Sequence, residues 1–334
     1  MINKRGFLKL FFFSIFIFFN FNLFAKETIK KLVKITSNVM YNSIFLKYHL
    51  SPGHPESPDR IKYIHKELIA NDFNNVILDF EKNEKLVSWV KKVHTYEHIK
   101  SIEQNYPLAH KVAFSAVNAA LSGIDRILKN GVDNVFCPVR PPGHHALNTG
   151  REEGFCYYNS IAIAAKYAQI KYQIKRILIV DWDYHHGNST EGLFYNDPDV
   201  LFFSTHDLYA YPGTGDPGRT GVGRGKGFNI NVHLPCGTND QLILKTYEEI
   251  LLPKVEIFRP ELILISAGFD SRKDDTLGCF EVSDEGFIKL TKLIMSIAAN
   301  YSNNKILSIL EGGYNVKGNA QASIAHLKAL NRLV

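Results

Sequence analysis

The sequence predicts an α/β domain with a mainly parallel central sheet, and two observations support this prediction. Six short runs are rich in Ile, Leu, Val and Phe on both faces, as strands are when a parallel sheet is covered on both sides. Helical patterns lie between several of these runs, and such alternation is typical of doubly wound sheets. The expected strands are residues 134–139, 176–183, 200–205, 228–234, 262–270 and 306–313, and the expected helices are residues 160–169, 241–251, 284–301 and 322–333.

The composition fits one globular domain. The chain has 334 residues, and 45% of them are hydrophobic, which is enough for a sizeable core. No internal repeat, linker or break in composition follows residue 30, so we expect a single domain over residues 30–334. The formal net charge of +6 is modest and the Lys and Arg residues are scattered, which argues against a nucleic-acid partner.

Residues 1–25 have the layout of a secretory signal peptide. Basic residues at positions 4, 5 and 9 precede an apolar run at residues 10–19, and the chain can be cleaved after Ala25. The apolar run is too short to span a bilayer comfortably. We therefore expect an exported protein, periplasmic or secreted, without stable membrane insertion after cleavage. An uncleaved N-terminal membrane anchor is the alternative.

The four cysteines are widely spaced and form no CxxC motif. An even number permits disulfides in an exported protein, although a domain of this size does not need them. We expect Cys137, Cys156, Cys236 and Cys279 to be small buried apolar residues.

Reactive side chains stand at the ends of four expected strands. In an open parallel sheet, the ligand crevice lies outside the carboxyl ends of the strands, so these side chains are expected to meet at one edge. They are His144 and His145 after the first strand, Asp181, Asp183 and His185 at the second, Asp270 at another and Tyr314 after the last.

The pattern D-x-D-x-H at the second of these strand ends suits a metal site. Alternate residues of a strand point to one face, which would let Asp181, Asp183 and His185 converge. One carboxylate and one imidazole from this segment, together with Asp270, would give two oxygens and one nitrogen and leave the fourth position open, as in catalytic zinc sites. We expect one Zn²⁺ per chain, which would lower the pKa of a water molecule to about 7. The same ligands accept Fe²⁺, Co²⁺ or Mn²⁺.

The histidine pair of RPPGHHA suits proton transfer. A histidine whose tautomer is held by a partner can serve both as base and as acid. His144 and His145 are candidates, with Asp181 and Asn188 as orienting partners. For His186 we expect packing or hydrogen bonding behind the site.

Several motifs in a fixed order resemble the zinc-dependent histone deacetylase superfamily. They are RPPGHHA, GFCYYNSIAIAA, VDWDYHHGN, FSTH, YPGTGD, SAGFDS and EGGYN, with GHPESPDR before them and HLKAL after. The resemblance is greatest to class II-like bacterial deacetylases, acetylpolyamine amidohydrolases and acetoin-utilisation proteins, and it covers about residues 41–333. It implies a three-layer arginase/deacetylase-like fold and hydrolysis of the acetyl (acyl) amide of acetyl-lysine or an acetylpolyamine.

The resemblance also implies a role for each candidate residue. The zinc ligands would be Asp183, His185 and Asp270, while His145 would take a proton from the attacking water and return one to the amine. His144, paired with Asp181, would be an electrostatic partner, and Asn188 would orient the second histidine. Tyr314 would donate its hydroxyl to the carbonyl oxygen. The channel walls would be Gly154, Phe155 and Tyr211, and a monovalent cation such as K⁺ would lie at the main chain of Asp181, Asp183, His185 and Thr205 and the side chain of Ser204.

Three departures from the family pattern affect the prediction. Ser189 replaces a usual glycine, which should be tolerated. Near the expected pocket mouth, Ser271, Arg272 and Thr276 stand where Ala, His and Pro are more usual. The span between HTYEHIKSIEQ and AFSAVNAA is short and lacks the acid with which the family grips a peptide backbone, so small acetylated amines rank above proteins as substrates.

Two other functions remain open at this point. An arginase-like ureohydrolase with two manganese ions would need further acids, usually in D-x-H-x-D, where this chain has D-Y-H-H-G. An inactive acyl-amine-binding module should have lost the tyrosine or a metal ligand, and this chain keeps them. The oligomeric state, the acyl group and the amine are not determined by the sequence.

Overall fold

An eight-stranded parallel sheet forms the centre of the protein. The structure is a computed structural model that describes residues 37–78 and 80–334, so the expected signal peptide lies outside the described residues. The strands, in their order across the sheet, are β2 (Val76–Ile77), β1 (Ser37–Met40), β3 (Asn134–Cys137), β8 (Ile306–Leu310), β7 (Leu262–Ala267), β4 (Ile177–Asp181), β5 (Val200–His206) and β6 (Asn229–His233).

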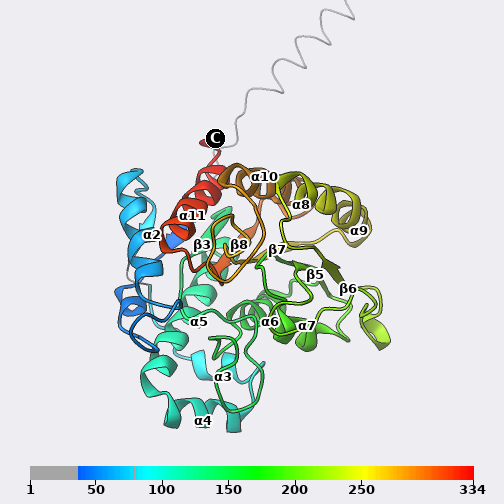
Figure 1. Ribbon diagram of the computed structural model, residues 1–334. Helices are drawn as coiled ribbons and strands as arrows, with labels where there is room; N and C mark the ends of the chain where they lie inside the picture. The colour runs from blue at the N-terminus through cyan, green and yellow to red at the C-terminus, as the bar shows by residue number, and fades with distance from the viewer. Residues whose placement is uncertain (1–36, 79) are drawn as a thin grey trace, which may run out of the picture. The chain divides into compact units, whose positions relative to one another are not determined.

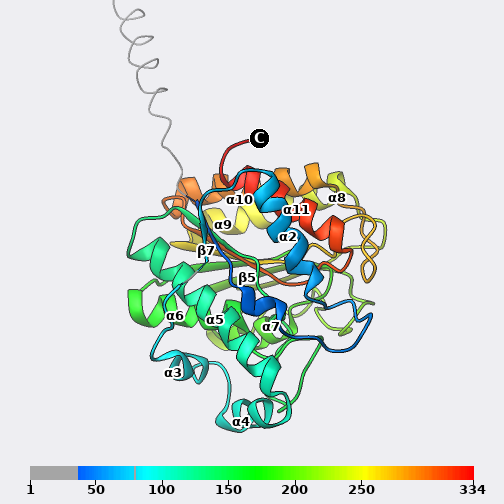
Figure 2. The ribbon, with the colours of Figure 1, turned by 90° about the vertical axis from the view of Figure 1, so that its left-hand side faces the viewer.

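Helices cover both faces of this sheet, which gives three layers (Figure 1 and Figure 2). One face carries α2 (Asp59–Ala70), α8 (Asp240–Thr246), α9 (Leu252–Phe258), α10 (Asp284–Tyr301) and α11 (Val316–Leu330). The other carries α5 (Pro107–Leu128), α6 (Ser160–Tyr172) and α7 (Asn188–Phe194), with α3 (Leu86–Val90) and α4 (Tyr96–Asn105) beyond them. Within the described residues, no helix is long and apolar enough to cross a membrane.

The predicted fold class is confirmed, and each of the six expected strands is present. The hydrophobic runs are strands because they are covered on both faces: every residue of β4, β5, β7 and β8 is buried. The sequence prediction missed the short strands β1 and β2 and the helices of the first 130 residues. β2 has only two residues, too few for a periodic pattern.

Several loops at the carboxyl ends of the strands lead into helices that begin with side-chain caps. Asn159 caps α6, Ser283 caps α10 and Asn315 caps α11, each by accepting a hydrogen bond from a backbone amide of the first turn. Since all strands run in parallel, the loops after β3, β4, β7 and β8 leave the sheet at one edge. The candidate site lies at this edge.

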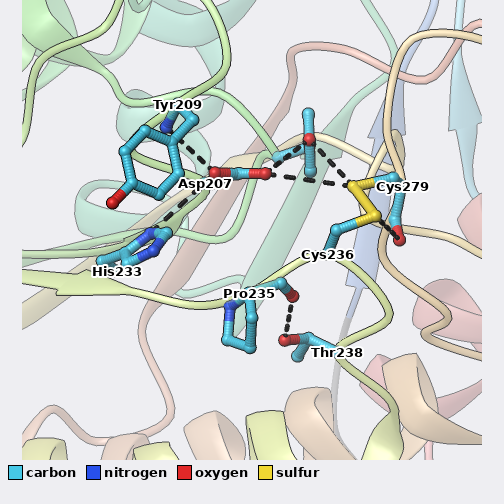
Figure 3. The surroundings of a disulfide bond; sticks show 8 residues. Asp207, Tyr209, His233, Pro235, Cys236, Thr238 and Cys279 are labelled. Atoms are coloured by element: carbon cyan, nitrogen blue, oxygen red, sulfur yellow. Dashed lines mark hydrogen bonds and ion pairs between the residues drawn. A yellow bond between two sulfur atoms is a disulfide. The ribbon is translucent and has the colours of Figure 1, made fainter.

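The cysteines fall into two pairs. Cys137 and Cys156 are buried and free, as predicted. The prediction is wrong for Cys236 and Cys279, which are joined by a disulfide across 43 residues (Figure 3). Cys236 follows β6 and Cys279 lies after β7, so the pairing depends on where two loops meet, which no local pattern reveals.

Candidate metal centre and catalytic site

Three predicted metal ligands come together at the carboxyl edge of the sheet. Asp183 and His185 lie in the loop after β4, and Asp270 lies in the loop after β7. One ligand atom from each lies within 4.8 Å of the others. His185 Nδ1 is 3.1 Å from Asp183 Oδ1 and 3.0 Å from Asp270 Oδ2. Two buried carboxylates and one imidazole are the donor set of a catalytic zinc site with an open position.

The route to this convergence differs from the sequence prediction. Strand β4 ends at Asp181, so Asp183 and His185 are placed by the following loop and not by strand alternation. Asp181 does not join the ligand cluster. Its Oδ1 accepts a hydrogen bond from the Asp183 amide at 3.2 Å, and its Oδ2 lies 2.9 Å from His144 Nδ1. The strand therefore supplies the partner of a histidine, and the loop supplies the ligands.

Two glycines make room for the ligand carboxylates. A Cβ at Gly268 would overlap the carboxylate of Asp183, and a Cβ at Gly312 would overlap those of Asp270 and Asp183. The Gly312 amide also donates to Asp183 Oδ2 at 2.7 Å, while the Tyr184 amide donates to Asp270 Oδ1 at 2.9 Å. The carboxylates are thus held in a cradle that suits a metal ion.

The two adjacent histidines have different partners. His144 Nδ1 faces the carboxylate of Asp181, whereas His145 Nδ1 lies 2.8 Å from the amide oxygen of Asn188. Burial lowers the pKa of His144, but the carboxylates of Asp181 and Asp183 outweigh it and hold this pKa well above 6.5. Burial, with the neighbouring His144, holds the pKa of His145 well below 6.5. The structure places Asp181 beside His144 and Asn188 beside His145, the two orienting partners that the sequence suggested.

A pocket of about 600 Å³ opens over these groups. The Tyr314 side chain is 7% exposed, and its ring packs edge-on against Phe155 at 5.7 Å between centroids. Burial raises the pKa of Tyr314 well above 10, so its hydroxyl keeps its proton. The pocket is lined by His145, Glu152, Gly154, Phe155, Tyr184, His185, Ala210, Tyr211, Leu277 and Tyr314.

The three predicted channel residues all lie in this lining. Gly154 has φ +53°, and a Cβ there would run into His145 and the ring of Tyr211, so the position requires glycine. The His145 and Tyr211 rings meet nearly at right angles at 5.0 Å between centroids. Because Gly154 has no side chain, the His145 and Tyr211 rings can approach each other, and the pocket is narrow at this point.

A sequence profile of the histone deacetylase domain matches residues 54–330. The chain belongs to the histone deacetylase family. A "Probable deacetylase" of Archaeoglobus fulgidus is 33% identical over 299 residues, covering 85% of this chain and 83% of that protein. The crystal structure of the HDA15 HD domain matches with a TM-score of 0.82 at 30% identity, covering 89% of this chain and 90% of that one.

Other family members are much longer. Histone deacetylase 15 of Arabidopsis thaliana is 34% identical over 296 residues, and the match covers 83% of this chain but 52% of that protein. The match to type-2 histone deacetylase 2 of Dictyostelium discoideum covers 21% of that protein. These relatives confirm the resemblance seen in the motifs and support deacetylase activity. The family typically uses a metal, which agrees with the Asp183, His185 and Asp270 cluster.

Two parts of this histone deacetylase site were missed by sequence reasoning. Glu311, buried at the end of β8, accepts hydrogen bonds from the amides of Gly143 at 2.6 Å and His144 at 3.1 Å. It therefore positions the turn that carries the histidine pair. Glu311 is the first residue of the motif EGGYN, to which the sequence analysis assigned no role at this position.

The second missed part is a buried ion cluster built from GHPESPDR and RPPGHHA. Arg140 donates to both carboxylate oxygens of Glu56, at 2.8 and 2.6 Å, and Arg60 lies 3.4 Å from the same carboxylate. Arg60 Nε also donates to the carbonyl of Gly313 at 2.7 Å, and its guanidinium lies 4.9 Å from the centre of the Tyr314 ring. The cluster ties the front of the chain to the tyrosine loop.

The four residues that depart from the family pattern lie at different places around the site. Ser189 is buried and donates to the Ala146 carbonyl at 2.5 Å. Ser271 and Arg272 do not lie at the pocket mouth, contrary to expectation. Ser271 is buried against the Trp182 carbonyl at 2.7 Å, and Arg272 pairs with Asp284 on α10. Thr276 is exposed, and the next residue, Leu277, forms part of the pocket wall.

Three further predictions concern residues around the site. His186 is hydrogen-bonded behind it, to Thr214 at 2.8 Å, as expected. Ser204 pairs with Asp181 across β5 and β4, so its position suits the monovalent cation site, which stays a prediction. The missing acidic loop corresponds to a single residue, Tyr106, between α4 and α5.

Proposed function

We propose that this chain is a zinc-dependent deacetylase that hydrolyses the acetyl amide of an acetylated primary amine to acetate and the free amine. The observation that supports the proposal is the meeting of a metal-type donor triad, a neutral histidine and a protonated tyrosine around one pocket. Each is what amide hydrolysis requires: an electrophile, a base and an oxyanion donor.

The residues of the chain divide the chemistry between them. A zinc ion held by Asp183, His185 and Asp270 would supply Lewis acidity toward the carbonyl and lower the pKa of water. His145 Nδ1 donates its proton to Asn188 Oδ1, which leaves Nε2 free to take a proton from water and pass one to the leaving amine. The Tyr314 hydroxyl donates to the oxygen on which charge develops.

The function is tested with the purified chain, acetyl-lysine peptides and N-acetylputrescine. We expect acetate release with at least one of them, loss of turnover with a chelator, and recovery with Zn²⁺. The proposal fails if neither substrate releases acetate or if chelation changes nothing.

Metal analysis separates this proposal from the arginase-like alternative. Within residues 37–78 and 80–334, one group of three His, Cys, Asp or Glu side chains can hold a metal, and a binuclear site needs further ligands. One zinc per active chain therefore agrees with the proposal. Two manganese ions per chain would favour the ureohydrolase.

Glu152 favours a small substrate with a second positive charge, such as an acetylpolyamine. Its carboxylate lines the pocket and accepts a hydrogen bond from the Phe155 amide. Among the described residues it has no cationic partner within ion-pair distance, whereas its neighbour Glu153 pairs with Arg151 at 3.3 Å. A pocket carboxylate without a partner attracts a cationic group of the substrate.

Glu152→Gln tests this preference against a matched neutral substrate. The variant should raise KM for N-acetylputrescine about tenfold, as for the loss of a charge-assisted hydrogen bond, and leave N-butylacetamide hydrolysis unchanged. Glu153→Gln is the control, since Glu153 does not line the pocket. Equal effects of Glu152→Gln on both substrates would contradict the preference.

We also propose that the protein is exported. The layout of residues 1–25 supports this, as does the disulfide between Cys236 and Cys279, because disulfides persist in oxidising compartments. Cell fractionation with N-terminal sequencing tests it. An intact N-terminus in the cytoplasm would contradict export.

A further inference from the structure

The backbone before Tyr314 does not hold this residue in place by itself. Tyr314 follows two glycines, and Gly313 has φ +116°, a conformation that other residues rarely adopt. Glycines allow the chain several conformations, so the position of the tyrosine must be set by contacts elsewhere. On its C-terminal side the chain enters α11 after the capping residue Asn315.

The carboxylate of Asp275 supplies such a contact. Its Oδ2 accepts hydrogen bonds from the amide of Tyr314 at 2.7 Å and from the amide of Asn315 at 2.9 Å. Its Oδ1 accepts from the amide of Leu277 at 2.9 Å. The Asn315 side chain also donates to the carbonyl of Asp274 at 2.9 Å. One carboxylate thus joins the loop after β7 to the loop after β8.

The loop that carries Asp275 is itself firmly held. It begins at the ligand Asp270, and Arg272 anchors it by donating to both carboxylate oxygens of Asp284, at 2.8 and 3.1 Å. Arg272 also donates to Gln321 on α11 at 2.9 Å. Asp275 therefore links Tyr314 to a segment whose position is set by the metal ligand at one end and by two helices.

We infer that Asp275 is a positioning residue for the deacetylation reaction, which acts by holding the main chain of Tyr314 so that its hydroxyl faces the substrate carbonyl. Asp275 is absent from the pocket lining, so it acts through Tyr314 and does not touch the substrate. This inference rests on the role proposed for Tyr314.

A double-mutant cycle on the full chain tests the inference, because only a residue that acts through Tyr314 loses its effect when the hydroxyl is removed. With N-acetylputrescine or an acetyl-lysine peptide, Asp275→Ala should lower kcat about 10- to 100-fold and change KM less than about threefold. In the Tyr314→Phe background the same change should lower kcat by less than about twofold. Asp275→Asn, which keeps one acceptor oxygen, should lose less activity than Asp275→Ala.

The control is Asp274→Asn, because Asp274 has φ +67° and Asn tolerates that conformation. It should leave kcat unchanged. Zinc content and melting temperature are measured for each variant, and if Asp275→Ala does not fold, the cycle is run with Asp275→Asn.

The outcomes separate the inference from the proposed function. If Tyr314→Phe does not lower kcat, the proposed role of Tyr314 fails and the inference fails with it. If Tyr314→Phe lowers kcat but the Asp275 variants do not, only the inference is overturned. It is also overturned if the Asp275 and Tyr314 effects multiply, since Asp275 would then act on stability or on the metal.

Discussion

His144 and His145 are neighbours in the chain, but their imidazoles are held by groups of different charge. Burial lowers the pKa of both, and the Asp181 carboxylate helps to reverse this effect for His144. The neutral amide of Asn188 does not do so for His145. His145 is therefore the imidazole that is free to accept a proton near neutral pH, which agrees with its proposed role as base.

Tyr314→Phe separates an enzyme from a binding module. The change removes one oxyanion donor, so kcat should fall about 100- to 1000-fold while KM changes little. Steady-state kinetics with N-acetylputrescine or an acetyl-lysine peptide measure both quantities. Wild-type protein that binds the acetylated amine and releases no acetate would favour the binding module.

At the scale of elements, the loops after the strands build the site and the strands bring the loops together. Parallel pairing puts the ends of β4, β7 and β8 side by side, although Asp183 and Gly312, which meet there, are 129 positions apart in the chain. Side chains from each loop then meet main-chain amides of another, as the Gly312 amide meets Asp183. These contacts between loops give the site its geometry.

Gly312→Ala should abolish metal binding without unfolding the domain. The added Cβ would overlap the carboxylates of Asp270 and Asp183, so the ligands would have to move. Elemental analysis after zinc loading, with circular dichroism, measures both effects. Gly192→Ala is the control, since a Cβ there meets nothing within 4 Å. A fully zinc-loaded Gly312→Ala protein would contradict this account.

Glu191 gives helix α7 a pH-dependent contribution to stability. Burial raises its pKa, but the nearby His186 imidazole, 3.3 Å away, and hydrogen bonds from Asn231 and Arg219 outweigh burial and lower this pKa from 4.5 to about 2. The folded state therefore favours the carboxylate. Its contribution is present above pH 4.5 and is lost as the pH falls toward 2.

Glu191→Gln should lower the free energy of unfolding by about 2 to 3 kcal/mol at pH 7, and the difference from wild type should shrink below pH 4.5. Urea unfolding of both proteins over a pH series measures this. The exposed Glu256→Gln variant serves as control. A difference that stays constant down to pH 3 would show that lost packing, and not charge, is responsible.

At the scale of the whole molecule, the net positive charge comes from the first 36 residues of the sequence. Residues 1–36 contain seven Lys or Arg and one Glu, so the net charge of +6 belongs to them and the rest of the chain is neutral. A neutral domain lacks the electrostatic attraction that nucleic-acid binders use.

The disulfide should stabilise the whole domain. It closes a loop of 43 residues and lies beside Asp207, which accepts a hydrogen bond from Tyr184 at 2.9 Å (Figure 3). The Cys236→Ser, Cys279→Ser double variant should lose about 2 to 4 kcal/mol of unfolding free energy. Alkylation of unreduced, denatured protein should label two of the four cysteines. Labelling of all four would contradict the pairing.

The sequence by itself determined the fold class and the residue types at the site. Runs such as residues 262–270 are hydrophobic on both faces, and only a covered parallel sheet accommodates several of them. The motifs marked Asp183, His185, Asp270, the histidine pair and Tyr314 because polar residues directly after buried strands collect at one edge. These signals are local in the chain, so one sequence suffices to find them.

Only the tertiary structure decided which groups touch. In the structure, Asp181 contacts His144 and is not among the metal ligands. Cys236 is bonded to Cys279, and the Asp275 carboxylate accepts a hydrogen bond from the Tyr314 amide. Arg272, which was expected at the pocket mouth, instead pairs with Asp284. The physical reason is that a hydrogen bond or a ligand set requires distances correct to a few tenths of an ångström between residues far apart in the chain, and these distances are set by loop conformation and packing, which periodicity and spacing do not encode.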